Sequence, residues 1–162
     1  MVTRIRGNNQ ALGCVTARIA QAGNGPHPTT FVYNGNTYRR AQKVVKVTPS
    51  AANTTANYPI TLYTTVPELS GMLASGLKLM KVRDGVPLSG NIAPADAELG
   101  ATTFTDAIGT KDYFDYTSTF TTGFSQFILA EPINVLPVTL PIFQAVPVNN
   151  KFIKLACLTE HE

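Results

Sequence analysis

The apolar residues of this chain recur mostly at every second position, a period typical of β-strands that bury one face. In residues 13–21, Val15, Ala17 and Ile19 share one face, and polar or small residues share the other. Residues 58–66 follow the same pattern, with apolar residues on one face and threonines and a tyrosine on the other. Further strands are expected in residues 29–40, 42–50, 77–82, 102–109 and 112–130.

Turn residues between these strands predict where the chain reverses. Asn34-Gly35 separates two β-rich runs, and an Asn-Gly step in this position predicts a tight hairpin. Residues 86–101 show no clear period, so we expect a surface loop there.

One short helix is expected between residues 67 and 76. A Pro-Glu pair suits the first turn of a helix, and a Gly suits its end. Its apolar residues, which recur at helical spacing, would pack into the core. They are Leu69, Met72 and Leu73.

A proline-containing segment divides the chain near its C-terminal end. We expect a first domain over residues 1–131, a linker over residues 132–137 and a strand pair over residues 138–162 that turns at Asn149-Asn150. Two strands cannot bury a face by themselves. The pair would therefore pack on the first domain, join another chain or begin a second domain.

The composition agrees with an all-β fold. Of the 162 residues 44% are hydrophobic, which suffices for a core, but only 14% are charged, below the roughly 25% typical of soluble domains. Short strands at regular intervals with little helix predict an Ig/fibronectin-like β-sandwich with one short helix.

The charge pattern argues against two kinds of partner. The net charge is only +3, and the basic residues of the first third are spaced as solvated strand and loop positions: Arg4, Arg6, Arg39, Arg40, Lys43 and Lys46. We therefore expect no nucleic-acid binding. No segment is apolar enough for membrane insertion, and residues 1–10 lack the apolar core of a signal peptide.

No arrangement of residues in the sequence indicates catalysis. A G-x-S-x-G motif is absent, and His27 and His161 stand apart from any candidate nucleophile. Cys14 and Cys157 lack the spacing of a metal site; they could form a disulfide, although two free buried thiols are the simpler interpretation. We therefore expect a protein that is not an enzyme and needs no cofactor.

Two groups of side chains could still bind a ligand. Carboxylates at irregular spacing could hold Ca²⁺, although such residues are more often only solvated. They are Asp96, Glu98, Asp106, Asp112 and Asp115. Tyrosines near Asn and Asp could stack on sugar rings if they face outward, or fill the core if they do not. They are Tyr33, Tyr38, Tyr113 and Tyr116.

Three segments near the C-terminus resemble exported proteins of Bacteroidetes that carry type IX secretion signals. In that family a strand S-F-S-x-F-x-L ends a β-domain, a linker leads to L-P-V-x-L-L-x-F-x-A, and a strand L-x-W-x-T-x-x-E follows. The residues that match are Phe124, Ser125, Phe127 and Leu129, then Leu136, Pro137, Val138, Leu140, Phe143 and Ala145, then Leu155, Thr159 and Glu160. Two positions depart from the pattern, with Cys157 in place of Trp and Pro141 in place of Leu.

The resemblance extends upstream and implies a function. Residues 58–72 and the opening strand at residues 13–23 are similar to a β-domain found in the same proteins. The family implies a non-catalytic β-sandwich module of a secreted or cell-surface protein, acting as a spacer, adhesin or accessory domain beside other domains. Because the alternation is still running at the C-terminus, we expect the chain to be a piece of a larger exported protein.

Two alternative functions remain open. One is a self-assembling structural subunit whose C-terminal strands complete a neighbour's sheet by strand addition. The residues that would carry it are Val138, Leu140, Phe143, Phe152 and Leu155. The other is a carbohydrate-binding module that uses the tyrosines.

Overall fold

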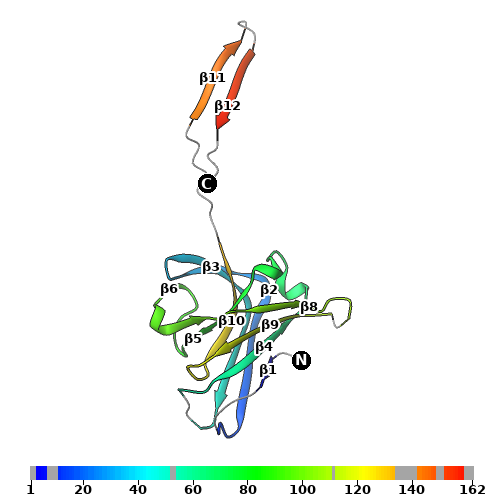
Figure 1. Ribbon diagram of the computed structural model, residues 1–162, viewed down its shortest axis with the longest axis vertical. Coiled ribbons are helices and arrows are strands. Elements are labelled where there is room, and N and C mark those ends of the chain that lie inside the picture. The colour runs from blue at the N-terminus through cyan, green and yellow to red at the C-terminus, as the bar shows by residue number, and fades with distance from the viewer. Residues whose placement is uncertain are drawn as a thin grey trace.

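Two packed β-sheets form the body of the protein (Figure 1). The computed structural model describes residues 3–6, 11–51, 54–110 and 112–133, and the backbone of residues 142–148 and 152–158. Strands make up most of these residues, and the all-β sandwich predicted from the sequence is confirmed. No helix in this part of the chain has the length and apolarity needed to cross a membrane.

The smaller sheet, called sheet A, has four antiparallel strands in the order β1-β4-β9-β8. Its strands are β1 (Thr3–Ile5), β4 (Tyr58–Thr64), β9 (Phe114–Phe120) and β8 (Thr103–Asp106). Along β4, the inward side chains of Tyr58, Ile60 and Leu62 are buried, as the alternation predicts.

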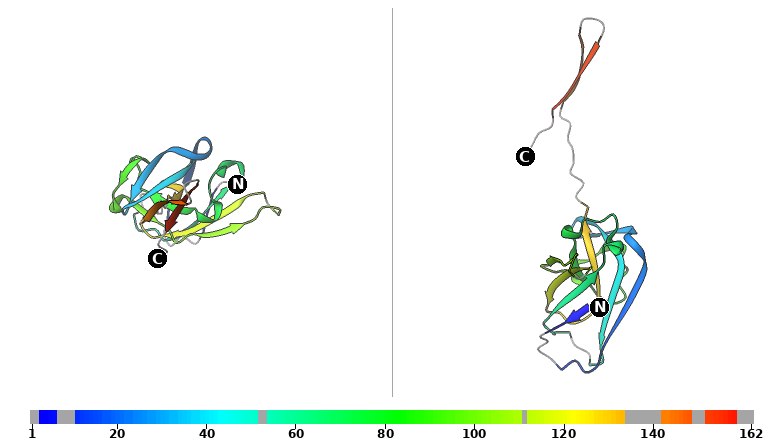
Figure 2. Two further views of the ribbon diagram at one scale, coloured as in Figure 1. Left: turned by 90° about the horizontal axis from the view of Figure 1, so that it is seen from above. Right: turned by 90° about the vertical axis from the view of Figure 1, so that its right-hand side faces the viewer.

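The larger sheet, called sheet B, has six strands in the order β6-β2-β3-β10-β5-β7. Its strands are β6 (Gly90–Ile92), β2 (Val15–Tyr33), β3 (Asn36–Pro49), β10 (Gln126–Pro132), β5 (Lys78–Val82) and β7 (Ala97–Leu99). Strand β6 pairs with β2 in parallel, and the other pairs are antiparallel. The long β2–β3 hairpin, blue to cyan in Figure 2, runs along one side of the body.

The hairpin turn at Asn34-Gly35 is confirmed. Tyr33 pairs with Asn36, and the two residues between them have φ angles of 49° and 76°. Positive φ at both central positions is the conformation that Asn-Gly favours and that fits the twist of a hairpin.

The main core lies between the two sheets. Tyr58 of β4 meets Phe124 and Phe127 in stacked and edge-on contacts, with ring centroids 3.9 and 6.4 Å apart. Its hydroxyl donates a hydrogen bond to the carbonyl of Gly123 at 2.5 Å, so the buried polar group is paired. Each large apolar side chain buried here contributes about 1.5–3 kcal/mol.

A second, smaller core covers the outer face of sheet B. Phe31, Met80 and Ile128 are buried there, and Val86 and Leu88 of the connection after β5 pack against them. Sheet B is therefore buried on both faces around β5 and β10.

The connection after β5 is more regular than its sequence suggests. We expected a surface loop over residues 86–101, but this segment contains β6, the 3-10 helix η3 (Pro94–Asp96) and β7. Both strands are only three residues long, too short for a period of two to stand out in the sequence.

The expected helix takes another form. Two 3-10 helices, η1 (Pro67–Leu69) and η2 (Ala74–Gly76), replace one continuous helix. Gly71 lies between them with a φ of 76°, which interrupts helical geometry. As a result Leu69 is buried as predicted, but Leu73 is 64% exposed, and its predicted place in the core is wrong.

The first part of β2 is more exposed than its alternation predicts. Ile19 and Ala17 pair with Val45 and Val47, which are buried in the main core, yet Ile19 itself is 46% exposed. The core ends at β3, and β2 is the next strand outward. Residues 15–21 of β2 form an edge of sheet B because β6 pairs only with residues 31–33, so their apolar face stays in contact with water.

The C-terminal strand pair is present. Strands β11 (Ile142–Val148) and β12 (Phe152–Leu158) pair with each other as a separate two-stranded antiparallel sheet. Strand β10 continues through Pro132, which we had assigned to the linker, and the N–H of Ile133 still donates to the carbonyl of Thr37 at 2.8 Å.

Candidate ligand-binding face of sheet A

The outer face of sheet A carries a row of polar side chains that strand pairing brings into register. Thr61 of β4 lies opposite Arg4 of β1 on one side and Thr117 of β9 on the other. Thr103 of β8 continues the row. Residues directly opposite each other in a sheet project from the same face, so these side chains stand side by side. The hydroxyls of Thr61 and Thr117 are 2.8 Å apart and hydrogen-bonded.

A second row lies next to the first. Tyr63 of β4 lies opposite Asp115 of β9, which in turn lies opposite Thr105 of β8. The ring of Tyr63 contacts that of Tyr113 edge-on, with centroids 5.1 Å apart. The first row thus supplies hydroxyls and a cation, and the second supplies a carboxylate beside the buried ring of Tyr63.

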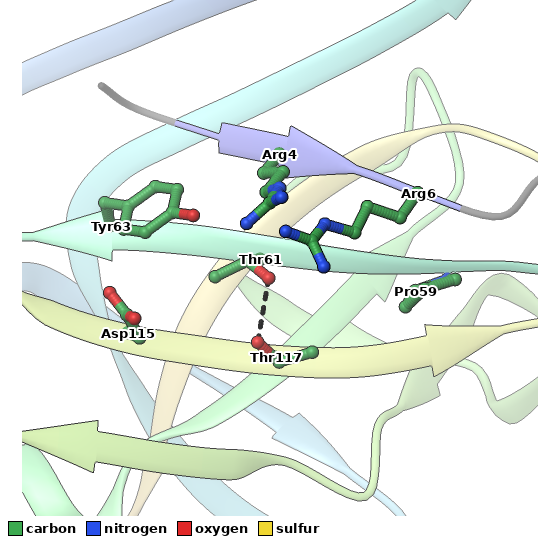
Figure 3. Close-up of a pocket in the computed structure, with 7 residues that line it drawn as sticks. All are labelled: Arg4, Arg6, Pro59, Thr61, Tyr63, Asp115 and Thr117. Atoms are coloured by element: carbon green, nitrogen blue, oxygen red, sulfur yellow. Dashed lines mark hydrogen bonds between the residues drawn. The ribbon is translucent and has the colours of Figure 1, made fainter.

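Two arginines close one side of this face. Arg4 of β1 and Arg6, which follows the end of β1, extend over β4 toward Thr61 (Figure 3). The N–H of Arg6 donates to the carbonyl of Pro59 at 3.2 Å, which holds this segment against β4. Together the arginines, β4 and β9 line a hollow of about 360 Å³. We call its lining residues the sheet A cleft: Arg4, Arg6, Pro59, Thr61, Tyr63, Asp115 and Thr117.

One polar atom of the sheet A cleft lacks a partner. The Oδ1 atom of Asp115 is buried, and within the described residues it accepts no hydrogen bond. A buried polar atom without a partner costs about 1–3 kcal/mol, and more when it is charged. Asp115 therefore brings to the cleft a carboxylate whose hydrogen-bonding capacity is not used up by the described residues.

The sequence leaves two possibilities open for the tyrosines, and most of them fill the core. Tyr33, Tyr38 and Tyr116 are buried, so they present no ring face to a ligand. The hydroxyls of Tyr33 and Tyr116 donate to the carbonyls of Ala97 and Ala74, at 3.1 and 2.9 Å. Burial raises the pKa of the Tyr116 phenol above its usual range. Only Tyr113 is half-buried, beside the sheet A cleft.

The carboxylates proposed for calcium are dispersed, and several already have partners. Asp96 pairs with Arg83, and Glu98 with the buried Lys81, each at 2.7 Å. The Oδ1 atom of Asp106 accepts the N–H of Ile108 at 2.9 Å. Asp112 and Asp115 also belong to no group, in the described part of the chain, of three or more residues suited to hold a metal ion.

The cysteine prediction was wrong in one respect. Cys14 is a free thiol, as the simpler interpretation had it, but it is exposed rather than buried. It precedes the exposed edge of β2, which explains the difference. The side chain of Cys157, on β12, lies outside the described residues.

The residues proposed for assembly lie outside the part of the structure whose side chains are described. Val138 and Leu140 fall between β10 and β11. Phe143 lies on β11, and Phe152 and Leu155 lie on β12, where only the backbone is described. Their role in assembly stays a prediction.

Sequence reasoning found only part of the sheet A cleft. The alternation in residues 58–66 places Thr61 and Tyr63 on the polar face of their strand, and this is correct. The spacing of Arg4 and Arg6 in the sequence predicts only dispersed surface charge. No local signal shows that their strand pairs with β4 rather than with another strand.

Comparisons with protein-family models, with curated proteins and with solved structures find no match to this chain.

Proposed function

We propose that the chain is a non-catalytic β-sandwich module of a secreted or cell-surface bacterial protein, and that the sheet A cleft binds a sugar chain, as an adhesin does. The observation that carries this proposal is the Asp115 carboxylate, which lies among hydroxyl and guanidinium groups and has an oxygen without a partner in the described residues. The resemblance of the C-terminal segments to exported Bacteroidetes proteins supports the location.

The mixture of groups in the cleft favours a polyhydroxylated ligand. Asp115 only accepts hydrogen bonds, Arg4 and Arg6 only donate them, and Thr61 and Thr117 do both. A sugar hydroxyl is both donor and acceptor, so neighbouring hydroxyls can satisfy both kinds of partner. A simple anion would meet the arginines but would be repelled by Asp115.

The number of carboxylates in the cleft supports binding rather than hydrolysis. Glycoside hydrolases of the common type use two carboxylates on either side of the scissile bond. The sheet A cleft is lined by one, Asp115. A single carboxylate among fixed donors is suited to hold hydroxyl groups in place.

A glycan array followed by titration of the strongest binder tests the proposal. We expect Asp115→Asn to weaken binding about tenfold or more, because it removes a charged hydrogen-bond acceptor. The matched control is Asp84→Asn, since Asp84 lies on a distant turn in an exposed ion pair with Lys46. Silence on the array, or equal affinity of Asp115→Asn and the native chain, would refute the proposal.

A second candidate is self-assembly through the C-terminal strands. Its motivation is that β11 and β12 form a sheet of their own and, within the described residues, pair with no strand of sheet A or B. An isolated two-stranded sheet is marginally stable in water, and both of its edges can accept another strand.

Light scattering over a wide concentration range tests whether the chain assembles through its C-terminal strands. Assembly through the strands predicts a mass that rises with concentration and returns to that of the monomer when residues 136–162 are deleted. A monomeric mass for the full chain at all concentrations would exclude it.

A further inference from the structure

We propose a second ligand site, for a single anionic group such as a carboxylate or sulfate, around Arg40 on the outer face of sheet B. The site is independent of the sheet A cleft. Arg40 lies on β3 between Tyr38 and Val44, which share its face of the sheet.

Arg40 is a buried cation without a carboxylate. It is only 8% exposed. Its Nη1 atom donates to the carbonyl of Ala41 at 3.1 Å, and its buried Nε atom has no partner among the described residues. A guanidinium remains charged even when buried, so it needs a compensating negative charge.

The other buried basic residues show how this protein usually supplies the compensating negative charge. Lys43 and Lys81 are the two other buried basic residues of the described chain, and each contacts a carboxylate. Lys43 pairs with Glu68 at 2.6 Å and Lys81 with Glu98 at 2.7 Å. Arg40 forms no ion pair within the same part of the chain, so none of these residues supplies its counter-charge.

A hollow in front of Arg40 has room for such a partner. It measures about 490 Å³ and lies where β2 departs from regular pairing between Gln21 and Thr30. Arg40 is the only charged residue in its lining. The other residues are Ile19, Ala20, Gln21, Ala22, His27, Gln42 and Val44.

His27 adds a second donor. The N–H of Thr29 donates to its Nδ1 atom at 3.2 Å, so the neutral ring carries its proton on Nε2. Burial, followed by the charge of Arg40, lowers the pKa of His27 below 6.5. An anion bound between the two would oppose the effect of Arg40 and raise that pKa.

The test is an NMR titration of the full ¹⁵N-labelled chain with sodium sulfate and with sodium acetate, at ionic strength held constant with sodium chloride. We expect saturable shifts of amides in residues 21–30 and 39–42, and a rise of the His27 pKa at saturation. Shifts that do not saturate, or that fall elsewhere, would overturn the proposal.

Variants distinguish anion binding at Arg40 from the general effect of removing one positive charge. Arg40→Gln should abolish the saturable shifts and raise the His27 pKa without any anion. Arg18→Gln removes an equal charge from an exposed position on β2 and should bind as the native chain does. Should Arg40→Gln not fold, Arg40→Lys keeps the charge without the planar fork and should bind at least tenfold more weakly. Native affinity in whichever Arg40 variant folds would contradict the proposal.

Discussion

At the scale of single residues, burial makes the stability of the protein depend on whether a charged side chain is paired. The Nζ atom of Lys43 contacts Glu68 at 2.6 Å and donates to the carbonyl of Tyr63 at 3.1 Å. Burial by itself would raise the pKa of Glu68, but hydrogen bonds from Lys43 and from the N–H of Thr65, with the charge of Lys43, hold it below its usual 4.5. The pair ties β3 to η1, which contains Glu68.

Glu68→Gln is expected to lower the free energy of unfolding by about 1–3 kcal/mol at pH 7, because it leaves the Lys43 ammonium buried without a counter-charge. Urea unfolding measures the change. Asp84→Asn is the matched control: the ion pair of Asp84 with Lys46 is exposed, so the loss should stay below about 1 kcal/mol. Equal losses in the two variants would contradict this assignment.

The effect of Glu68→Gln should also depend on pH. A carboxyl whose pKa is lowered by folding stabilises the protein above its unfolded pKa, and this contribution is lost as the pH falls through the folded pKa. The difference in stability between the native chain and Glu68→Gln should therefore shrink as the pH falls below 4.5. A difference that stays constant from pH 7 to pH 3 would show that the charge of Glu68 is not its source.

At the scale of elements, features such as tight turns depend on the conformational preferences of a few adjacent residues. The β2–β3 turn is the clearest case, because Gly35 has a φ of 76° and open space around its missing side chain. A substitution there changes backbone strain and little else.

Gly35→Ala should lower the free energy of unfolding by about 1 kcal/mol, since Cβ disfavours the left-handed region. Gly35→Asn is the matched control and should cost less, because Asn adopts this region more readily. Thermal unfolding of both variants shows which of them is the more stable. An Ala variant as stable as the native chain would show that the turn does not hold this conformation in solution.

The strands and the hairpin turn could be predicted from the sequence because their signals are local. The two 3-10 helices within residues 67–76 could not be predicted. The apolar residues there have the spacing of one continuous helix, which Gly71 interrupts. The burial of β2 was also mispredicted. Alternation shows that Ile19 shares a face with Val15 and Ala17, but not whether another element covers that face.

At the scale of the whole molecule, the body is expected to be independent of the C-terminal strands. Sheets A and B contain strands β1–β10 only, and the last backbone hydrogen bond described in the body joins Ile133 to Thr37. A chain ending at Ile133 should therefore unfold cooperatively, with a melting temperature within about 4 °C of the full chain. Circular dichroism checks this, and loss of cooperative unfolding would show that the strand pair completes the core.

The candidate sites depend on pairing between distant segments, which limits what the sequence can reveal. Arg4 meets Thr61, and Thr61 meets Thr117, through contacts that span more than fifty residues at each step. Arg40 is recognisable as a site only because no carboxylate of the described residues pairs with it, a property of the packed structure. The tyrosines singled out from the sequence had the right chemistry, but three of the four serve the core.

The most direct test of the central claim, that the sheet A cleft binds a sugar chain, is an amide NMR map of the native chain titrated with the strongest oligosaccharide from the array. We predict saturable shifts concentrated in residues 3–6, 60–64 and 114–118, together with their loss in Asp115→Asn. Shifts confined to sheet B, or the absence of any oligosaccharide that produces saturable shifts, would contradict the claim.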